Sequence, residues 1–238
     1  MKVPSIALAL ARVRLGVLIG ASVVAGGFGP TNAQSVNDRG FSADIIMTRD
    51  QVAVPAGRLQ VLDGRVRIEI PEFPNAFFLV DTAKPSSYFI RPAMRMYMDA
   101  RQSSVLTRLF VPVDPEDPCR QWQAMAQLAG VAGQGDWRCE RAREEQIEGR
   151  NTVVVRATFG PGREYLGWID PLRRFPLRID PETGISFTLA NIHDAAQPVA
   201  AFELPSGLQK FSPEALVDRI KQSDVWVSGS SDAGSSPR

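Results

Sequence analysis

Apolar and polar side chains alternate with a period of two residues over most of the chain from residue 41 onward. The alternation is clearest over 65–70, where valine and isoleucine share one strand face and charged residues share the other. Asp63-Gly64 separates this run from a second one over 58–62, and Asp-Gly between two such runs is a strong hairpin signal. The pattern predicts a sheet with one apolar and one solvated face.

Runs of the same kind recur at short intervals along the chain. Besides that hairpin, the expected strands are 41–48, 76–81, 87–91, 94–99, 151–159, 163–170, 175–180, 185–192 and 199–203. Segments rich in glycine and proline separate several of them. Short strands at such regular spacing favour a sandwich or a barrel, so we expect one mainly β domain.

Two helices are expected within this β pattern. Over 119–129, Trp122, Met125 and two alanines recur at steps of three and four residues, which places them on one helical stripe. Over 213–222, Ser212 can cap the helix and Pro213 suits its first position. The mature domain is therefore expected to span 34–227, with an inserted helix and a C-terminal helix.

Residues 1–33 have the pattern of a secretory signal peptide. Three basic residues precede an apolar run from Leu15 to Phe28, and small residues occupy positions 31 and 33. A membrane anchor is the alternative, but spanning a bilayer takes ~20 apolar residues and this run contains four glycines. We therefore expect cleavage after Ala33 and a periplasmic protein. The tail over 228–238 has too few apolar groups to order itself.

Charge and residue content exclude several classes of function. Removing 1–33 leaves 24 basic and 26 acidic residues, which argues against a nucleic-acid binder. The single histidine, His193, stands beside Asp194, but no Gly-x-Ser-x-Gly motif accompanies it. One histidine and two cysteines do not make the usual zinc sites. We expect no catalytic residue, no metal and no cofactor.

Cys119 and Cys139 are expected to form a structural disulfide, since cysteine pairs of exported proteins usually do. A redox pair and a metal site are the alternatives. The Cys-x-x-Cys spacing of a redox pair is absent.

Met94, Met96 and Met98 would all point to one side of a strand over 94–99. They could fill a core, line an adaptable apolar pocket, or hold Cu(I), which prefers thioether ligands. For a pocket, the candidate lining residues are Phe77, Leu79, Phe89, Met94, Met96, Met98, Trp122 and Met125.

A series of short motifs, taken in order, resembles the LolA-like superfamily of periplasmic outer-membrane lipoprotein carriers. The motifs are Phe41-Ser-Ala-Asp44, Arg65-Val-Arg-Ile-Glu69, Ile90-Arg91-Pro92, Met96-Tyr97-Met98-Asp99, Gln146-Ile-Glu-Gly-Arg-Asn-Thr152, Gly167-Trp168-Ile169-Asp170, Phe175-Pro176-Leu-Arg-Ile179 and Phe202-Glu-Leu-Pro-Ser-Gly207. The resemblance implies a curved, unclosed antiparallel half-barrel with covering helices. In the carrier proper, its apolar hollow holds lipoprotein acyl chains. The inserted helix and its cysteine loop depart from the carrier pattern.

The leading hypothesis is an exported protein that binds a lipid or acyl chain and acts in outer-membrane lipoprotein or lipid handling. The alternative is an envelope scaffold or interaction protein with a filled core, a protein partner and no small-molecule ligand. An enzyme with dispersed carboxylates and a copper binder are weaker hypotheses. A hollow inner face would favour the first hypothesis over the second.

Overall fold

The structure is a computed structural model that describes residues 40–100, 104–131, 137–160, 162–181, 183–214 and 217–218. The expected signal peptide, the tail over 228–238 and most of the expected helix over 213–222 lie outside these residues. Within the described ranges, no helix has the length and apolar character needed to span a membrane.

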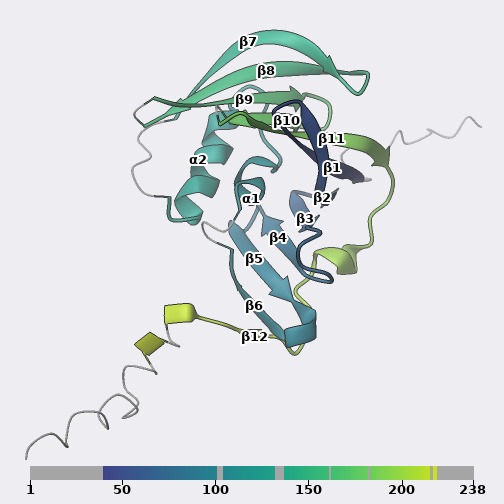
Figure 1. Cartoon of the computed structure of the whole chain (residues 1–238), viewed down its shortest axis with the longest axis vertical. Coiled ribbons are helices and arrows are strands. Elements are labelled where there is room, and N and C mark those ends of the chain that lie inside the picture. Colours follow the sequence, from purple (N-terminus) through teal and green to yellow (C-terminus); the bar gives the residue numbers. More distant parts are fainter. Residues whose placement is uncertain are drawn as a thin grey trace, which may run out of the picture. The chain divides into compact units, whose positions relative to one another are not determined.

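Twelve strands form one sheet, in the order β12-β6-β5-β4-β3-β2-β1-β11-β10-β9-β8-β7 (Figure 1). The strands are β1 Phe41–Arg49, β2 Val52–Leu62, β3 Arg65–Glu69, β4 Phe77–Asp81, β5 Ser86–Arg91, β6 Met96–Asp99, β7 Arg138–Ile147, β8 Arg150–Phe159, β9 Arg163–Asp170, β10 Phe175–Pro181, β11 Ile185–Asp194 and β12 Gln209–Lys210. Every pairing is antiparallel except that of β12 with β6. The sheet curves strongly and does not close, because β7 and β12 are its two edges.

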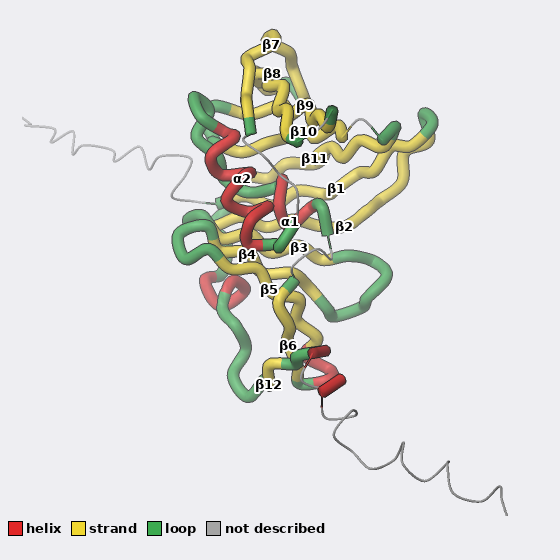
Figure 2. The backbone as a smooth tube through the Cα atoms, turned by 90° about the vertical axis from the view of Figure 1, so that its left-hand side faces the viewer, coloured by secondary structure: helices red, strands yellow, loops and turns green. Residues whose placement is uncertain are grey.

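Two α-helices, α1 (Leu106–Leu109) and α2 (Pro118–Leu128), cover the inner face of this curved sheet (Figure 2). Helix α2 agrees within a residue with the expected helix over 119–129. Asp117 caps its start by accepting a hydrogen bond from the Arg120 amide, and Gly130 ends it at a φ of +68°. The amide of Gly130 donates to Gln127 and that of Val131 to Ala126, the hydrogen-bond pattern of a Schellman motif. The predicted fold class, a mainly β unclosed half-barrel with covering helices, is confirmed.

The period-two alternation places the core between the inner face and the two helices. Val66 and Ile68 of β3, fully buried, belong to the same apolar cluster as Ile169 of β9 and Trp122 of α2. The Trp122 indole N–H donates to the Leu109 carbonyl at 3.0 Å. A Cβ atom on Gly167 of β9 would lie 2.6 Å from the Trp122 ring, so this close approach of helix to sheet requires glycine.

The Cys119–Cys139 disulfide is present, with Cα atoms 5.6 Å apart. It ties the first turn of α2 to the edge strand β7. The bridge therefore fixes the covering helix to one end of the sheet.

Several segments differ from their expected structure. Helix α1 and strand β12 were not expected, and β2 begins at Val52 rather than at residue 58. Segment 199–203 is the 3-10 helix η4 (Val199–Phe202) rather than a strand. Strand β6 begins at Met96 instead of 94, because η2 (Pro92–Met94) forms a turn that ends with Arg95 at a φ of +50°. Strand β7 was not expected, since it carries charges on both faces; as a solvated edge it has no apolar face to bury.

Candidate ligand-binding site

Five of the eight residues that the sequence singled out lie on the inner side of the sheet, and three of them, Phe89, Trp122 and Met125, belong to one apolar cluster. Phe89 and Met98 are cross-strand neighbours on β5 and β6, and Met96 lies on the same face. Trp122 and Met125 project from α2 into the core, where they are 0% and 1% exposed. Phe89, Met96 and Met98 are only partly buried.

The other three residues lie elsewhere. Phe77 and Leu79 of β4 point to the outer face and form a second apolar cluster with Ile90. The Arg67 guanidinium covers Phe77, with its carbon 3.4 Å from the ring centroid. Met94 belongs to η2 and is 54% exposed. The three methionines therefore do not form the continuous strand row on which the copper interpretation depends.

The deep part of the half-barrel is filled by protein side chains. Phe110 after α1, Trp122 on α2 and Leu177 on β10 are all fully buried there. The surface of the described residues contains separate recesses of about 290 to 540 Å³. Met125, Phe77 and Met98 border three different ones.

One recess, which we call the α2–β5 hollow, opens beside the core and has a volume of about 510 Å³. Its wall combines the C-terminal end of α2 with residues of α1 and the start of β5. The lining residues are Pro85, Ser86, Ser87, Tyr88, Asp99, Thr107, Arg108, Met125, Leu128, Ala129 and Gly130. Helix α2 supplies the apolar wall, whereas β5 and α1 supply hydroxyl groups and a guanidinium.

Two residues that border this hollow each have a buried side-chain atom without a hydrogen-bond partner, Oγ of Ser87 and Nε of Arg108. Among the described residues, no carboxylate forms an ion pair with Arg108. Burial lowers the pKa of the Arg108 guanidinium from its usual value; Tyr165 acts in the opposite direction and the cation of Arg163 lowers it further. Arginine nevertheless keeps its charge in proteins.

Local structure explains why Arg108 faces the hollow. The Ser104 hydroxyl accepts from the Leu106 amide at 3.2 Å, and the Ser104 carbonyl accepts from the Thr107 hydroxyl at 2.9 Å, which starts α1. Leu106 and Leu109 then enter the core. Arg108 lies between these core positions and borders the hollow.

Met125 is the one candidate residue from the sequence that borders this hollow. A signal for Arg108 was nevertheless present. It is the sole charged residue in the otherwise apolar or uncharged run 105–113. Such a residue in a buried run needs either a partner or a ligand.

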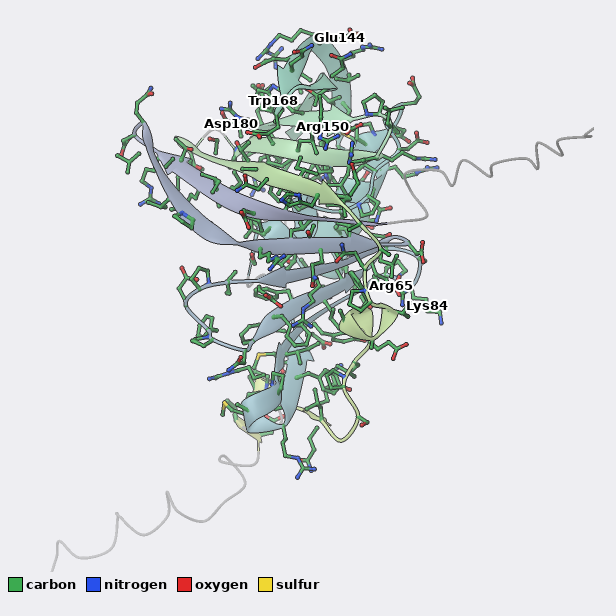
Figure 3. The ribbon with its side chains drawn as sticks, turned by 90° about the vertical axis from the view of Figure 1, so that its right-hand side faces the viewer. Arg65, Lys84, Glu144, Arg150, Trp168 and Asp180 are labelled. Atoms are coloured by element: carbon green, nitrogen blue, oxygen red, sulfur yellow. A yellow bond between two sulfur atoms is a disulfide. The ribbon has the colours of Figure 1, made fainter. Side chains whose placement is uncertain are left out.

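Other polar clusters have structural roles. Arg173, with a side chain 5% exposed, donates to Asp170 at 2.6 Å and also to Asp194, so it ties the β9–β10 turn to the end of β11. Trp168 of β9 is labelled in Figure 3. On the outer face it lies beside Arg178 of the next strand, whose guanidinium carbon is 4.6 Å from the Trp168 ring centroid. In the described part of the chain, no group of histidine, cysteine and carboxylate side chains could hold a metal ion.

No protein-family model and no curated protein matches the chain. Similar solved structures include MucB in complex with MucA(peri), at 12% identity over 76% of this chain and with a TM-score of 0.40. This chain spans 59% of that MucB chain and 61% of MucB in a second structure.

Two further structures are similar at the same level. A PNGF-II structure has 5% identity, covers 77% of this chain and 34% of its own, and gives a TM-score of 0.46. A putative outer membrane lipoprotein-sorting protein domain from Vibrio parahaemolyticus has 10% identity, covers 65% and 85%, and gives 0.30. At these scores the likenesses carry no argument about function.

Proposed function

We propose that the protein is an exported envelope protein that binds one lipidic ligand, such as an acyl chain, in the α2–β5 hollow. The observation that supports this proposal is the lining of the hollow, in which apolar residues of α2 lie beside two residues with unpartnered polar groups. Its volume of about 510 Å³ lies within the range of ~300–1,000 Å³ typical of ligand pockets. The ligand would lie at the margin of the half-barrel, because the deep concavity is filled.

Export is supported by the disulfide between Cys119 and Cys139, since such bonds persist mainly in oxidising compartments. The signal-peptide pattern of residues 1–33 points to the same compartment. N-terminal sequencing of the protein purified from the envelope is expected to begin at Gln34. A start at Met1 would contradict cleavage.

The direct test of ligand binding is extraction of the protein purified from its native envelope, followed by mass spectrometry. We expect a co-purifying lipid in about equimolar amount and, after its removal, saturable binding of a fluorescent fatty acid. If neither is found, lipid binding is ruled out.

A pair of variants locates the ligand. Leu128 borders the hollow and is 38% exposed, so Leu128→Glu places a charge against the chain with little effect on the core. Leu172→Glu is the matched control, because Leu172 lies outside the hollow and is 74% exposed. Only the first variant is expected to lose fatty-acid binding. Equal binding by both would place the ligand elsewhere.

The filled core favours a second candidate, an envelope interaction protein that has no small-molecule ligand. A rigid sheet without an internal cavity can still present a surface to a protein partner. Failure of both lipid tests, together with site-specific photo-crosslinking from the outer face to one envelope protein, would favour this second function over the first.

A further inference from the structure

We propose that the α2–β5 hollow selects an anionic ligand, a single apolar chain that ends in a carboxylate or phosphate bound by Arg108 and Ser87. This inference rests on the proposed function, because it names the chemical class of ligand for the same hollow.

The first support is the concentration of unsatisfied polar groups. Native proteins pair ~90% or more of their buried polar groups, so each exception needs an explanation. Among the described residues four buried side-chain atoms have no partner, and two of them, on Ser87 and Arg108, border this one hollow. A ligand with acceptor oxygens would satisfy both after a rotation of the two side chains toward the hollow.

The second support is the charge balance of the hollow. Among the described residues, Asp99 is the only carboxylate that borders it, and Lys210 forms an ion pair with Asp99 at 2.9 Å. Of the titratable groups that act on the pKa of the Arg108 guanidinium, Tyr165 raises it and a second cation, Arg163, lowers it. The field at the hollow is therefore positive and favours an anion.

The third support is the type and placement of the donors. A guanidinium presents parallel N–H groups that match the two oxygens of a carboxylate or phosphate, and a serine hydroxyl adds a third donor. Both side chains come from ordered elements. The Ser87 carbonyl accepts from the Ala100 amide at 2.8 Å, and the Arg108 amide donates to Val105 at 3.1 Å. The anion site is thus held by strand and helix backbone.

The fourth support is the apolar wall, which distinguishes an amphiphile from a free anion. Met125 and Ala129 of α2 are buried at the hollow, and Leu128 is partly exposed beside them. Methionine adapts to chains of variable shape. A ligand whose apolar chain lies along α2 and whose charged end lies at Arg108 would contact both the apolar and the polar lining of the hollow.

Calorimetric titration of the delipidated protein with four probes tests the inference. The probes are dodecanoate, dodecyl phosphate, dodecan-1-ol and inorganic phosphate. The two amphiphilic anions are used below their micellar concentrations and the alcohol below its solubility limit. We expect both chain-bearing anions to bind at least about tenfold more tightly than the alcohol, because hydrogen bonds to charged groups are the stronger ones. The anion that binds more tightly shows whether the hollow prefers the carboxylate of a fatty acid or a phosphate head group. Inorganic phosphate is expected to bind weakly.

Variants assign the selectivity to the named residues. Arg108→Gln is expected to bring dodecanoate down to the affinity of the alcohol, Arg108→Lys to retain part of the preference, and Ser87→Ala to weaken both anions. Arg58→Gln, which removes an exposed arginine outside the hollow, is the matched control and is expected to bind as the unaltered protein does. The unaltered protein alone also tests the inference, so a variant that fails to fold does not prevent a result.

The outcomes separate the two levels of the proposal. Equal binding of dodecanoate and dodecan-1-ol overturns anion selection and leaves lipid binding intact. Binding of none of the chain-bearing probes overturns the proposed function itself. If inorganic phosphate binds as tightly as the chain-bearing anions, the apolar chain adds no affinity. That result would contradict an amphiphilic ligand and leave only an anion site.

Discussion

The two ends of the sheet follow the same alternation of side chains but are covered differently. At the β8–β10 end, the inner-face residues Val155, Ile169 and Ile179 are at most 3% exposed, because α2 lies across them. At the β5–β6 end, the inner-face residues Phe89 and Met98 remain half-buried. Alternation therefore decides which side chains point inward, whereas the position of α1 and α2 decides whether those side chains are packed or accessible.

The largest expected effect comes from Trp122, which fills the covered end. Trp122→Ala is expected to reduce the free energy of unfolding by about 3–5 kcal/mol, as for other buried aromatics. Phe73→Ala is the matched change at the open end. Phe73 is 43% exposed and packs edge-on against Phe89, so its loss should cost only about 1 kcal/mol, as for an aromatic pair. Urea unfolding measures both, and equal losses would contradict the difference between the two ends.

The next largest effect is expected for the disulfide that holds α2 to β7. Replacing both Cys119 and Cys139 with serine should destabilise the protein by about 2–4 kcal/mol, as is usual for native disulfides. Thermal melting with and without dithiothreitol measures this effect. The double variant should be insensitive to the reductant. A reductant-insensitive melting temperature in the unaltered protein would mean that the bridge does not hold the helix.

A smaller effect is expected where α2 contacts the sheet most closely. Gly167→Ala would place a Cβ atom 2.6 Å from the Trp122 ring, so the helix or the ring must shift. Overpacking of this kind costs about 1–3 kcal/mol. Gly184→Ala, whose added Cβ meets nothing within 4 Å at a φ of +74°, shows the effect of backbone strain alone, which Gly167 does not share because its φ is not positive. Near-ultraviolet circular dichroism of the tryptophan signal should change only in the Gly167 variant.

The smallest effect is expected at the open end, where Lys210 of β12 pairs with Asp99 of β6. The hydrogen bond that the Lys210 ammonium donates to the Asp99 carboxylate raises the pKa of Lys210. A cation whose pKa is raised on folding stabilises the folded state below its unfolded pKa, and this stabilisation is lost as pH rises through the folded pKa. Lys210→Met should therefore lower the melting temperature slightly at neutral pH, and the difference should vanish well above the ordinary lysine pKa of ~10.4. A difference that is independent of pH would show that the ion pair is not its cause.

Much of the fold could be predicted because its signals are local. The Asp63-Gly64 hairpin and the helix from Pro118 to Leu128 depend on turn chemistry, capping and periodicity within a few residues. Strand β7 could not be predicted, since an edge strand with charges on both faces has no periodic signal. Met94 lies in η2 rather than in the expected strand, because Pro92 begins a turn there.

The candidate site could be predicted only in part, because its residues come from distant segments. Ser87 and Arg108 meet Met125 only once β5, α1 and α2 are assembled. The facing of Phe77 and Leu79 depends on the strand register, since a shift of one residue exchanges the two faces.

Most of the strands, the inserted helix and the cysteine pairing could be predicted from the sequence alone, since each depends on neighbouring residues or on the only two cysteines present. Only the tertiary structure decided that the helix fills the half-barrel and that an unpaired arginine borders the space left over. The physical reason is that burial and pairing are properties of contacts between distant segments, and no local pattern of side chains specifies which segments meet.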